Sequence, residues 1–218
     1  GWIAMPLLLV LIGSLIPKGG KIKSLLLLLF LAGVFVVFYY VDQQVRGRID
    51  AAYFELYKIF VSGEVSNGSV GVRFQLWHVA WLEFLQHPLT GVGLGQYYNE
   101  KLLLVKAGFA GSVVQIFQFA HNEPMHILAE MGLLGFISLM MMHLSSLLLC
   151  LHYKKEKFTL AIAGMLIVFT RFDISLSQVQ LAYHTTTLFY CLLFAIVAGF
   201  MCRPAAPNNQ LKLSTKSV

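Results

Sequence analysis

The sequence predicts an all-α polytopic membrane protein with about five transmembrane helices and a large helical loop on one side of the membrane. Two features of its composition predict this fold. Hydrophobic residues make up 58% of the 218 residues and charged residues only 12%, about half the charged share of a typical soluble domain. The apolar residues also gather in long runs that approach or reach the roughly 20 residues of a membrane span. This composition excludes a disordered chain, a coiled coil and most soluble enzymes.

Five apolar segments are the candidate spans. They are Trp2–Ile16, Ser24–Val41, Leu133–Leu151, Phe158–Thr170 and Leu181–Met201. The first and fourth are short, and the fourth gains length if Arg171 extends its side chain toward the membrane surface. We therefore predict two transmembrane helices in residues 1–41, a loop in 42–130, three transmembrane helices in 131–202 and a tail in 203–218. Because Gly1 opens directly into an apolar run, we expect this chain to be the C-terminal part of a larger helix bundle.

The basic residues predict the orientation. Nine of the sixteen lysines and arginines lie in three short segments, Pro17–Lys23, His152–Lys157 and the tail after Met201. Short basic segments face the cytoplasm. The loop of residues 42–130 and a short turn around Arg171-Phe172-Asp173 then face the outer side.

The long loop has helical features of its own. Aromatic residues recur at helical spacing in Asp50–Phe60 and again in Arg73–Gln86, so both segments are predicted to be amphipathic helices. The second helix stops before His87-Pro88, because a residue that precedes proline avoids the helical region. The glycines of Gly91-Val92-Gly93-Leu94-Gly95 are predicted to let the backbone pass close to a bulky neighbour.

A third helix is predicted to begin at Asn122. Asparagine is a good N-cap, and proline is tolerated at Pro124 because its missing N–H has no helical partner in the first turn. If the helix is continuous to Leu151, it is about 45 Å long and its first turns stand above the membrane.

Two residues of the loop suit the handling of a phosphorylated substrate. Arg73 carries a planar, permanently charged guanidinium that suits phosphate oxygens. His121 lies at the free N-terminus of the third helix, where the helix dipole favours an anion, and its imidazole takes up a proton near neutral pH. Other interpretations stay open. Arg73 also suits an ion pair with Glu64 or Glu83, and His121 suits an ordinary residue beside a helix cap.

His126 and Glu130 lie four residues apart and suit either a helical pair or two ligands of a zinc site. No third ligand stands at a convincing spacing, so we predict no metal.

The order of these motifs resembles the O-antigen ligase and O-antigen polymerase superfamily of bacterial envelope glycosyltransferases. The resemblance rests on four motifs and on the spacing of ten residues between His121 and Gly132. The motifs are Arg73-Phe74-Gln75-Leu76-Trp77, Pro88-Leu89-Thr90-Gly91-Val92-Gly93, His121-Asn122 and Glu130-Met131-Gly132-Leu133-Leu134-Gly135. The family often has a further histidine where Phe119 stands, and a Ser-Arg-Gly turn where this chain has Pro17-Lys18-Gly19-Gly20.

The resemblance implies a metal-independent glycosyltransferase without a cofactor, in the bacterial inner membrane with its loop in the periplasm. It implies transfer of a glycan from undecaprenyl diphosphate to an acceptor hydroxyl, for which we expect the lipid A core sugar. Arg73 would contact the diphosphate and His121 would activate the acceptor. The candidates for a supporting role are Asn122, His126, Glu130, Arg46 and Arg48.

Three alternatives remain at this point. A protein O-oligosaccharyltransferase of the pilin-modifying type and an O-antigen polymerase share the donor and differ in the acceptor. A non-enzymatic transporter segment would instead place ionisable residues along a path through the spans.

Overall fold

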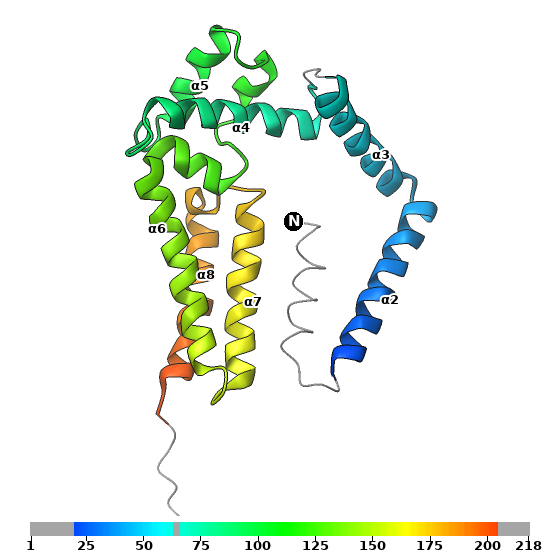
Figure 1. Ribbon diagram of the computed structural model, residues 1–218, viewed down its shortest axis with the longest axis vertical. Helices are drawn as coiled ribbons and strands as arrows, with labels where there is room; N and C mark the ends of the chain where they lie inside the picture. The colour runs from blue at the N-terminus through cyan, green and yellow to red at the C-terminus, as the bar shows by residue number, and fades with distance from the viewer. Residues whose placement is uncertain (1–19, 63–65, 205–218) are drawn as a thin grey trace, which may run out of the picture.

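The computed structural model describes residues 20–62 and 66–204, and every regular element in those ranges is a helix (Figure 1). The α-helices are α2 (Gly20–Val41), α3 (Gln43–Tyr57), α4 (Ser69–Gln86), α5 (Tyr97–Lys106), α6 (Glu123–Tyr153), α7 (Phe158–Ser175) and α8 (His184–Cys202). Three short elements join them, namely a π-helical turn at Lys58–Ser62 (η1) and 3₁₀ turns at Ser112–Ile116 (η2) and Gln180–Ala182 (η3). The predicted all-α fold is confirmed.

Three described helices are long and apolar enough to cross a membrane, namely α6, α7 and α8. In α2, the part from Leu29 to Val41 is a shorter apolar helix. The predicted span Trp2–Ile16 lies outside the described residues. The chain is therefore a multi-pass membrane protein.

Helices α6, α7 and α8 alternate in direction and α2 begins at the end where α6 finishes, so the basic segments collect at one end of the molecule (Figure 1). The start of α2, the α6–α7 connection and the end of α8 lie at one end, and α3, α4 and α5 lie at the other (Figure 1). At the first end, the Lys157 ammonium donates hydrogen bonds to the carbonyls of Phe200 (3.0 Å), Met201 (2.7 Å) and Arg203. A lysine thus satisfies carbonyls that the end of α8 leaves without helical partners. We call the opposite end the loop end.

The predicted turn around Arg171-Phe172-Asp173 is wrong. All three residues lie in α7, which continues to Ser175. The connection to α8 is instead made by residues 176–183, which we call the α7–α8 connection. The helix continues past Arg171 because this guanidinium is buried and paired with a carboxylate, and does not extend toward the membrane surface.

Helix α4 lies across the loop end of the α6–α8 bundle (Figure 1). Its position follows from its apolar face, where Val79 and Ala80 pack in a buried cluster with Tyr97, Ala120 and Ala129. The predicted helix Arg73–Gln86 is thus confirmed and begins four residues earlier. The predicted Asp50–Phe60 helix also forms, as the end of α3 and the π-turn that follows it.

Helix α6 is interrupted at Gly132, so the long helix is not continuous. Gly132 has φ 61° and ψ −156°, a backbone conformation that is essentially restricted to glycine. The interruption separates the carbonyls of Ala129 and Glu130 from the N–H groups of Leu133 and Leu134.

The segment Pro88–Gly93 replaces the missing helical bonds. Its N–H groups donate to the freed carbonyls and its carbonyls accept from the freed N–H groups, in the pairs Val92–Ala129 (2.8 Å), Gly93–Glu130 (2.9 Å), Leu133–Pro88 (2.8 Å) and Leu134–Leu89 (3.2 Å). A Cβ atom at Gly91 would lie 2.3 Å from the backbone carbon of Glu130. The glycine turn was predicted to pass close to a bulky neighbour, and this neighbour is the backbone of α6.

Candidate functional site

His121 lies at the loop end, directly before the N-cap of α6. Its backbone has φ 50°, in the left-handed region that residues other than glycine seldom adopt. The side chain is half-buried, and the imidazole meets the ring of Phe117 edge-on with 5.4 Å between the ring centroids. A strained backbone of this kind persists where neighbouring contacts fix it, and such residues cluster at functional sites.

Three consecutive side chains, His121, Asn122 and Glu123, contact the α7–α8 connection. Nδ1 of His121 lies 3.2 Å from Oε1 of Gln178. Nδ2 of Asn122 donates to the carbonyl of Leu176 (3.2 Å), while its Oδ1 caps α6 by accepting from the N–H of Met125 (3.0 Å). The predicted N-cap is confirmed.

Glu123 forms a buried ion pair with Arg171. The guanidinium donates to both carboxylate oxygens, at 3.0 and 3.2 Å, and neither side chain is more than 3% exposed. The backbone N–H of Leu181 also donates to Glu123 (2.5 Å), and the guanidinium lies 5.6 Å from the ring centroid of Tyr190. The pair fixes the start of α6 to the end of α7 and to the α7–α8 connection.

Sequence reasoning missed this ion pair. The two residues are 48 positions apart, and the sequence signal is only that each is a charged residue beside an apolar run.

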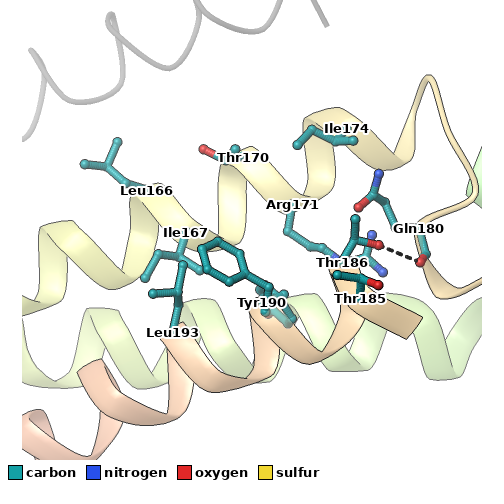
Figure 2. A pocket seen from close by; sticks show the side chains of 11 residues that line it. Leu166, Ile167, Thr170, Arg171, Ile174, Gln180, Thr185, Thr186, Tyr190 and Leu193 are labelled. Atoms are coloured by element: carbon teal, nitrogen blue, oxygen red, sulfur yellow. Dashed lines mark hydrogen bonds between the residues drawn. The ribbon is translucent and has the colours of Figure 1, made fainter. Parts of the chain in front are cut away.

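A cavity of about 500 Å³ lies between α7 and α8, next to Arg171. Figure 2 shows Leu166, Ile167 and Leu193 toward one end of it, and Arg171, Gln180 and Thr186 toward the other. The hydroxyl of Thr186 donates to the carbonyl of Gln180 (3.2 Å). The cavity is therefore apolar along most of its length and polar near the loop end.

Arg73 is exposed on α4, and it makes no hydrogen bond or ion pair with the residues that the structure describes. The suggested pair with Glu83 is wrong, because both carboxylate oxygens of Glu83 are buried without a hydrogen-bond partner. Glu64 lies outside the described residues.

Residues beside Arg73 on α4 pack with Phe117, and Phe117 contacts His121. The neighbours of Arg73 on α4, Val72 and Leu76, belong to a buried cluster against which Phe117 packs. The ring of Phe117 in turn contacts the ring of His121. Both candidate residues therefore lie at the loop end, and no direct contact joins them.

The other candidates lie in two places. Arg46 and Arg48 are exposed on α3, where Arg46 pairs with Asp50 (3.6 Å). His126 and Glu130 are buried on α6 and lie 3.6 Å apart (Nε2 to Oε1), which is the helical pair suggested by their spacing. Within the described ranges, no third histidine, cysteine, aspartate or glutamate joins these two in a metal-binding group.

Glu83, which sequence reasoning considered only as a partner of Arg73, is a buried acid. Its pKa is raised to about 9, chiefly by burial and also by the charges of Glu100 and Glu130, while Lys101 acts in the opposite direction. Burial also lowers the pKa of Lys101 to about 8. At neutral pH the folded protein therefore keeps Glu83 protonated.

Replacing Glu83 with glutamine is expected to stabilise the protein increasingly as the pH rises from 5 to 8. Over this range the unfolded chain has an ionised Glu83 and the folded chain a protonated one, so the folded chain binds more protons and the wild-type protein loses stability with rising pH. Glutamine removes this loss, which is on the order of a few kcal/mol at pH 8. The measurement is the melting temperature of the purified protein, followed by tryptophan fluorescence, at several pH values. The exposed Glu156→Gln is the control, and parallel curves for E83Q and the wild type would contradict a protonated Glu83.

Comparison with known proteins matches residues 1–140 to the O-antigen ligase family. A protein of Haemophilus influenzae described as "Uncharacterized protein" is 22% identical over 196 residues, which cover 87% of this chain and 49% of that protein. This chain thus spans about half the length of that relative. The family match covers well over half of the chain and includes Arg73, the glycine turn and the histidine at the start of α6, so the protein belongs to the O-antigen ligase family.

Proposed function

We propose that this protein transfers a glycan from undecaprenyl diphosphate to an acceptor hydroxyl at the periplasmic face of the bacterial inner membrane. The acceptor that we propose is a sugar of the lipid A core. The reaction needs a base for the acceptor hydroxyl and a cation for the diphosphate that leaves, and we assign no metal to it. Family membership supports the class of reaction, and the residues at the loop end supply the two groups.

The observation that carries the proposal is the placement of His121. Its imidazole is half-buried, its backbone is held in an unusual conformation, and three consecutive side chains anchor its segment to the α7–α8 connection. In the described part of the chain, Nε2 of the imidazole has no hydrogen-bond partner. A nitrogen without a partner on a fixed ring suits a base that accepts the proton of an acceptor hydroxyl.

Arg73 is the group that we assign to the diphosphate. Its guanidinium is exposed at the same end as His121 and has no carboxylate partner among the described residues. A guanidinium can bind two phosphate oxygens at once and offset the charge that develops on the leaving diphosphate. Asn122 supports the base by capping α6, and the buried pair of His126 and Glu130 lies one turn further along the same helix.

The test is transfer by variants in a strain that lacks the chromosomal copy of the gene. His121→Ala is expected to reduce transfer by about 10²- to 10⁴-fold, the usual contribution of a positioned base. Arg73→Lys is also expected to impair transfer, because a point charge does not reproduce the planar fork. The measurement is the amount of glycan-capped lipopolysaccharide and of unused lipid-linked glycan, at equal abundance of the protein in the membrane.

Matched controls come from the opposite end of the molecule. His152→Ala and Arg203→Lys change the same residue types at exposed positions there and are expected to leave transfer unchanged. Wild-type transfer by His121→Ala would remove the assigned base, and wild-type transfer by Arg73→Lys would reduce Arg73 to a surface residue.

The same strain distinguishes the alternative acceptors. Loss of glycans from periplasmic proteins alone would indicate a protein O-oligosaccharyltransferase, and loss of long glycan chains on the lipid carrier would indicate a polymerase. The transporter alternative is not favoured, because the buried charges of Glu123 and Arg171 neutralise each other at one end of the bundle and do not follow a path through it.

A further inference from the structure

We propose that Gln178 is a positioning residue that fixes the tautomer of His121, so that Nδ1 carries the proton and Nε2 is the basic nitrogen. This inference rests on the proposed role of His121 as the base. It adds a residue from the α7–α8 connection, which lies beyond residue 140, where the match to the family ends.

The first argument is the chemistry of the contact. Oε1 of Gln178 lies 3.2 Å from Nδ1 of His121, and an amide oxygen can only accept a hydrogen bond. With the amide in this orientation Nδ1 carries the proton, and in the neutral ring the lone pair then lies on Nε2. Nε2 is the nitrogen that lacks a partner within the described ranges.

The second argument is that the backbone on both sides of Gln178 is fixed. The N–H of Gln178 donates to the carbonyl of Ile174 (2.9 Å) at the end of α7. On one side the carbonyl of Leu176 accepts from Asn122, and on the other the N–H of Leu181 donates to Glu123. The amide therefore approaches the ring from a rigid support, which favours a set geometry over a chance surface contact.

The third argument is that the partner of the imidazole at this contact is a neutral amide. Of the groups on the surrounding elements, Glu123 and Arg171 pair with each other, and the ammonium of Lys101 donates to the carbonyl of Phe117. The titratable residue of the α7–α8 connection is Tyr183, whose ring lies against Phe119. A neutral amide thus orients the imidazole without placing a carboxylate beside it.

The direct test is the protonation state of the two ring nitrogens. The full chain is labelled with ¹⁵N-histidine and placed in lipid nanodiscs at a pH where the ring is neutral, and the resonances of His121 are assigned by their loss in His121→Gln. Protonated Nδ1 and unprotonated Nε2 are expected in the wild type. In Gln178→Leu this pattern is expected to give way to a mixture or to the opposite tautomer. A wild-type ring protonated at Nε2 would overturn the inference, since it would mean that the amide nitrogen of Gln178 donates to Nδ1.

Transfer activity supplies a second, independent reading with the lipid-linked glycan as substrate. Gln178→Leu is expected to lower kcat by about 10- to 100-fold, part of the contribution of a positioned base, while KM for the lipid-linked glycan changes little. Gln178→Glu retains the acceptor and adds a negative charge, so the acid limb of the pH–rate profile is expected to move up by about one pH unit. Ser177→Ala is the control, because within the described ranges its hydroxyl bonds only to the carbonyl of Ile174 at the end of α7.

The outcomes separate the two proposals. If His121→Ala abolishes transfer while Gln178→Leu keeps the wild-type kcat, the positioning role of Gln178 is wrong and the proposed function stands. If His121→Ala retains transfer, the proposed base is wrong whatever Gln178→Leu does. A Gln178→Glu profile that coincides with the wild-type profile would also overturn the positioning role.

Discussion

Replacing Arg171 with alanine is expected to destabilise the folded protein by about 3–5 kcal/mol, the usual cost of leaving one member of a buried ion pair without its partner. Glu123 is fully buried, and without the guanidinium it keeps a single hydrogen bond, from the N–H of Leu181. Arg171→Lys is expected to rescue little, since an ammonium does not bind both carboxylate oxygens in the same geometry. The measurement is the melting temperature in detergent, together with the amount of protein that reaches the membrane.

A double variant tests the reason for this loss. Arg171→Met combined with Glu123→Gln removes both charges, and it is expected to be more stable than Arg171→Ala because no buried charge remains unpaired. The two substitutions should therefore be strongly non-additive, as expected for residues in direct contact. Equal losses in Arg171→Ala and the double variant would indicate that packing, and not the buried carboxylate, dominates.

Replacing Gly132 with alanine is expected to destabilise the protein by roughly 3 kcal/mol or more, since it combines backbone strain with a steric clash. A Cβ atom there would lie 2.5 Å from the backbone carbon of Leu89 and 2.6 Å from the backbone nitrogen of Thr90. These backbone atoms can move only if the four hydrogen bonds between the Pro88–Gly93 segment and α6 break. The measurement is again the melting temperature, with transfer activity as a second readout.

Gly199→Ala is the matched control for Gly132→Ala. Gly199 lies in the last turn of α8, and a Cβ atom there meets no atom within 4 Å, so the change is expected to be neutral or to stabilise by up to about 1 kcal/mol. Gly91→Ala adds a Cβ atom to the same contact from the Pro88–Gly93 segment. It is expected to lower the melting temperature as Gly132→Ala does. A melting temperature of Gly132→Ala equal to that of the wild type would show that α6 can adopt a regular helix at this point.

The helices and their spans could largely be predicted from the sequence. Helical spacing of aromatic residues predicted α4, asparagine followed by proline predicted the start of α6, and apolar runs predicted α6, α7 and α8. These signals are local, since each depends on residues within one or two helical turns. His121 was found for the same reason, because its place beside an N-cap is a property of the neighbouring residues.

The errors arose where a distant partner changes the meaning of a residue. Arg171 was predicted to lie in a turn, where its side chain could lengthen the fourth span by extending toward the membrane surface. The structure supplies Glu123 as its partner and the helix continues. The glycines near Gly91 were predicted to pass a bulky neighbour, but the sequence contained no sign that this neighbour is the backbone of α6.

By itself the sequence determined the class of protein, its helices and the residue that we propose as the base, because composition, periodicity and capping act over short stretches of chain. The tertiary structure alone decided the surroundings of that residue. Arg171 joins Glu123 across 48 positions and Gln178 joins His121 across 57. Contacts over such separations depend on how three helices pack at the loop end, and no local pattern in the sequence encodes that packing.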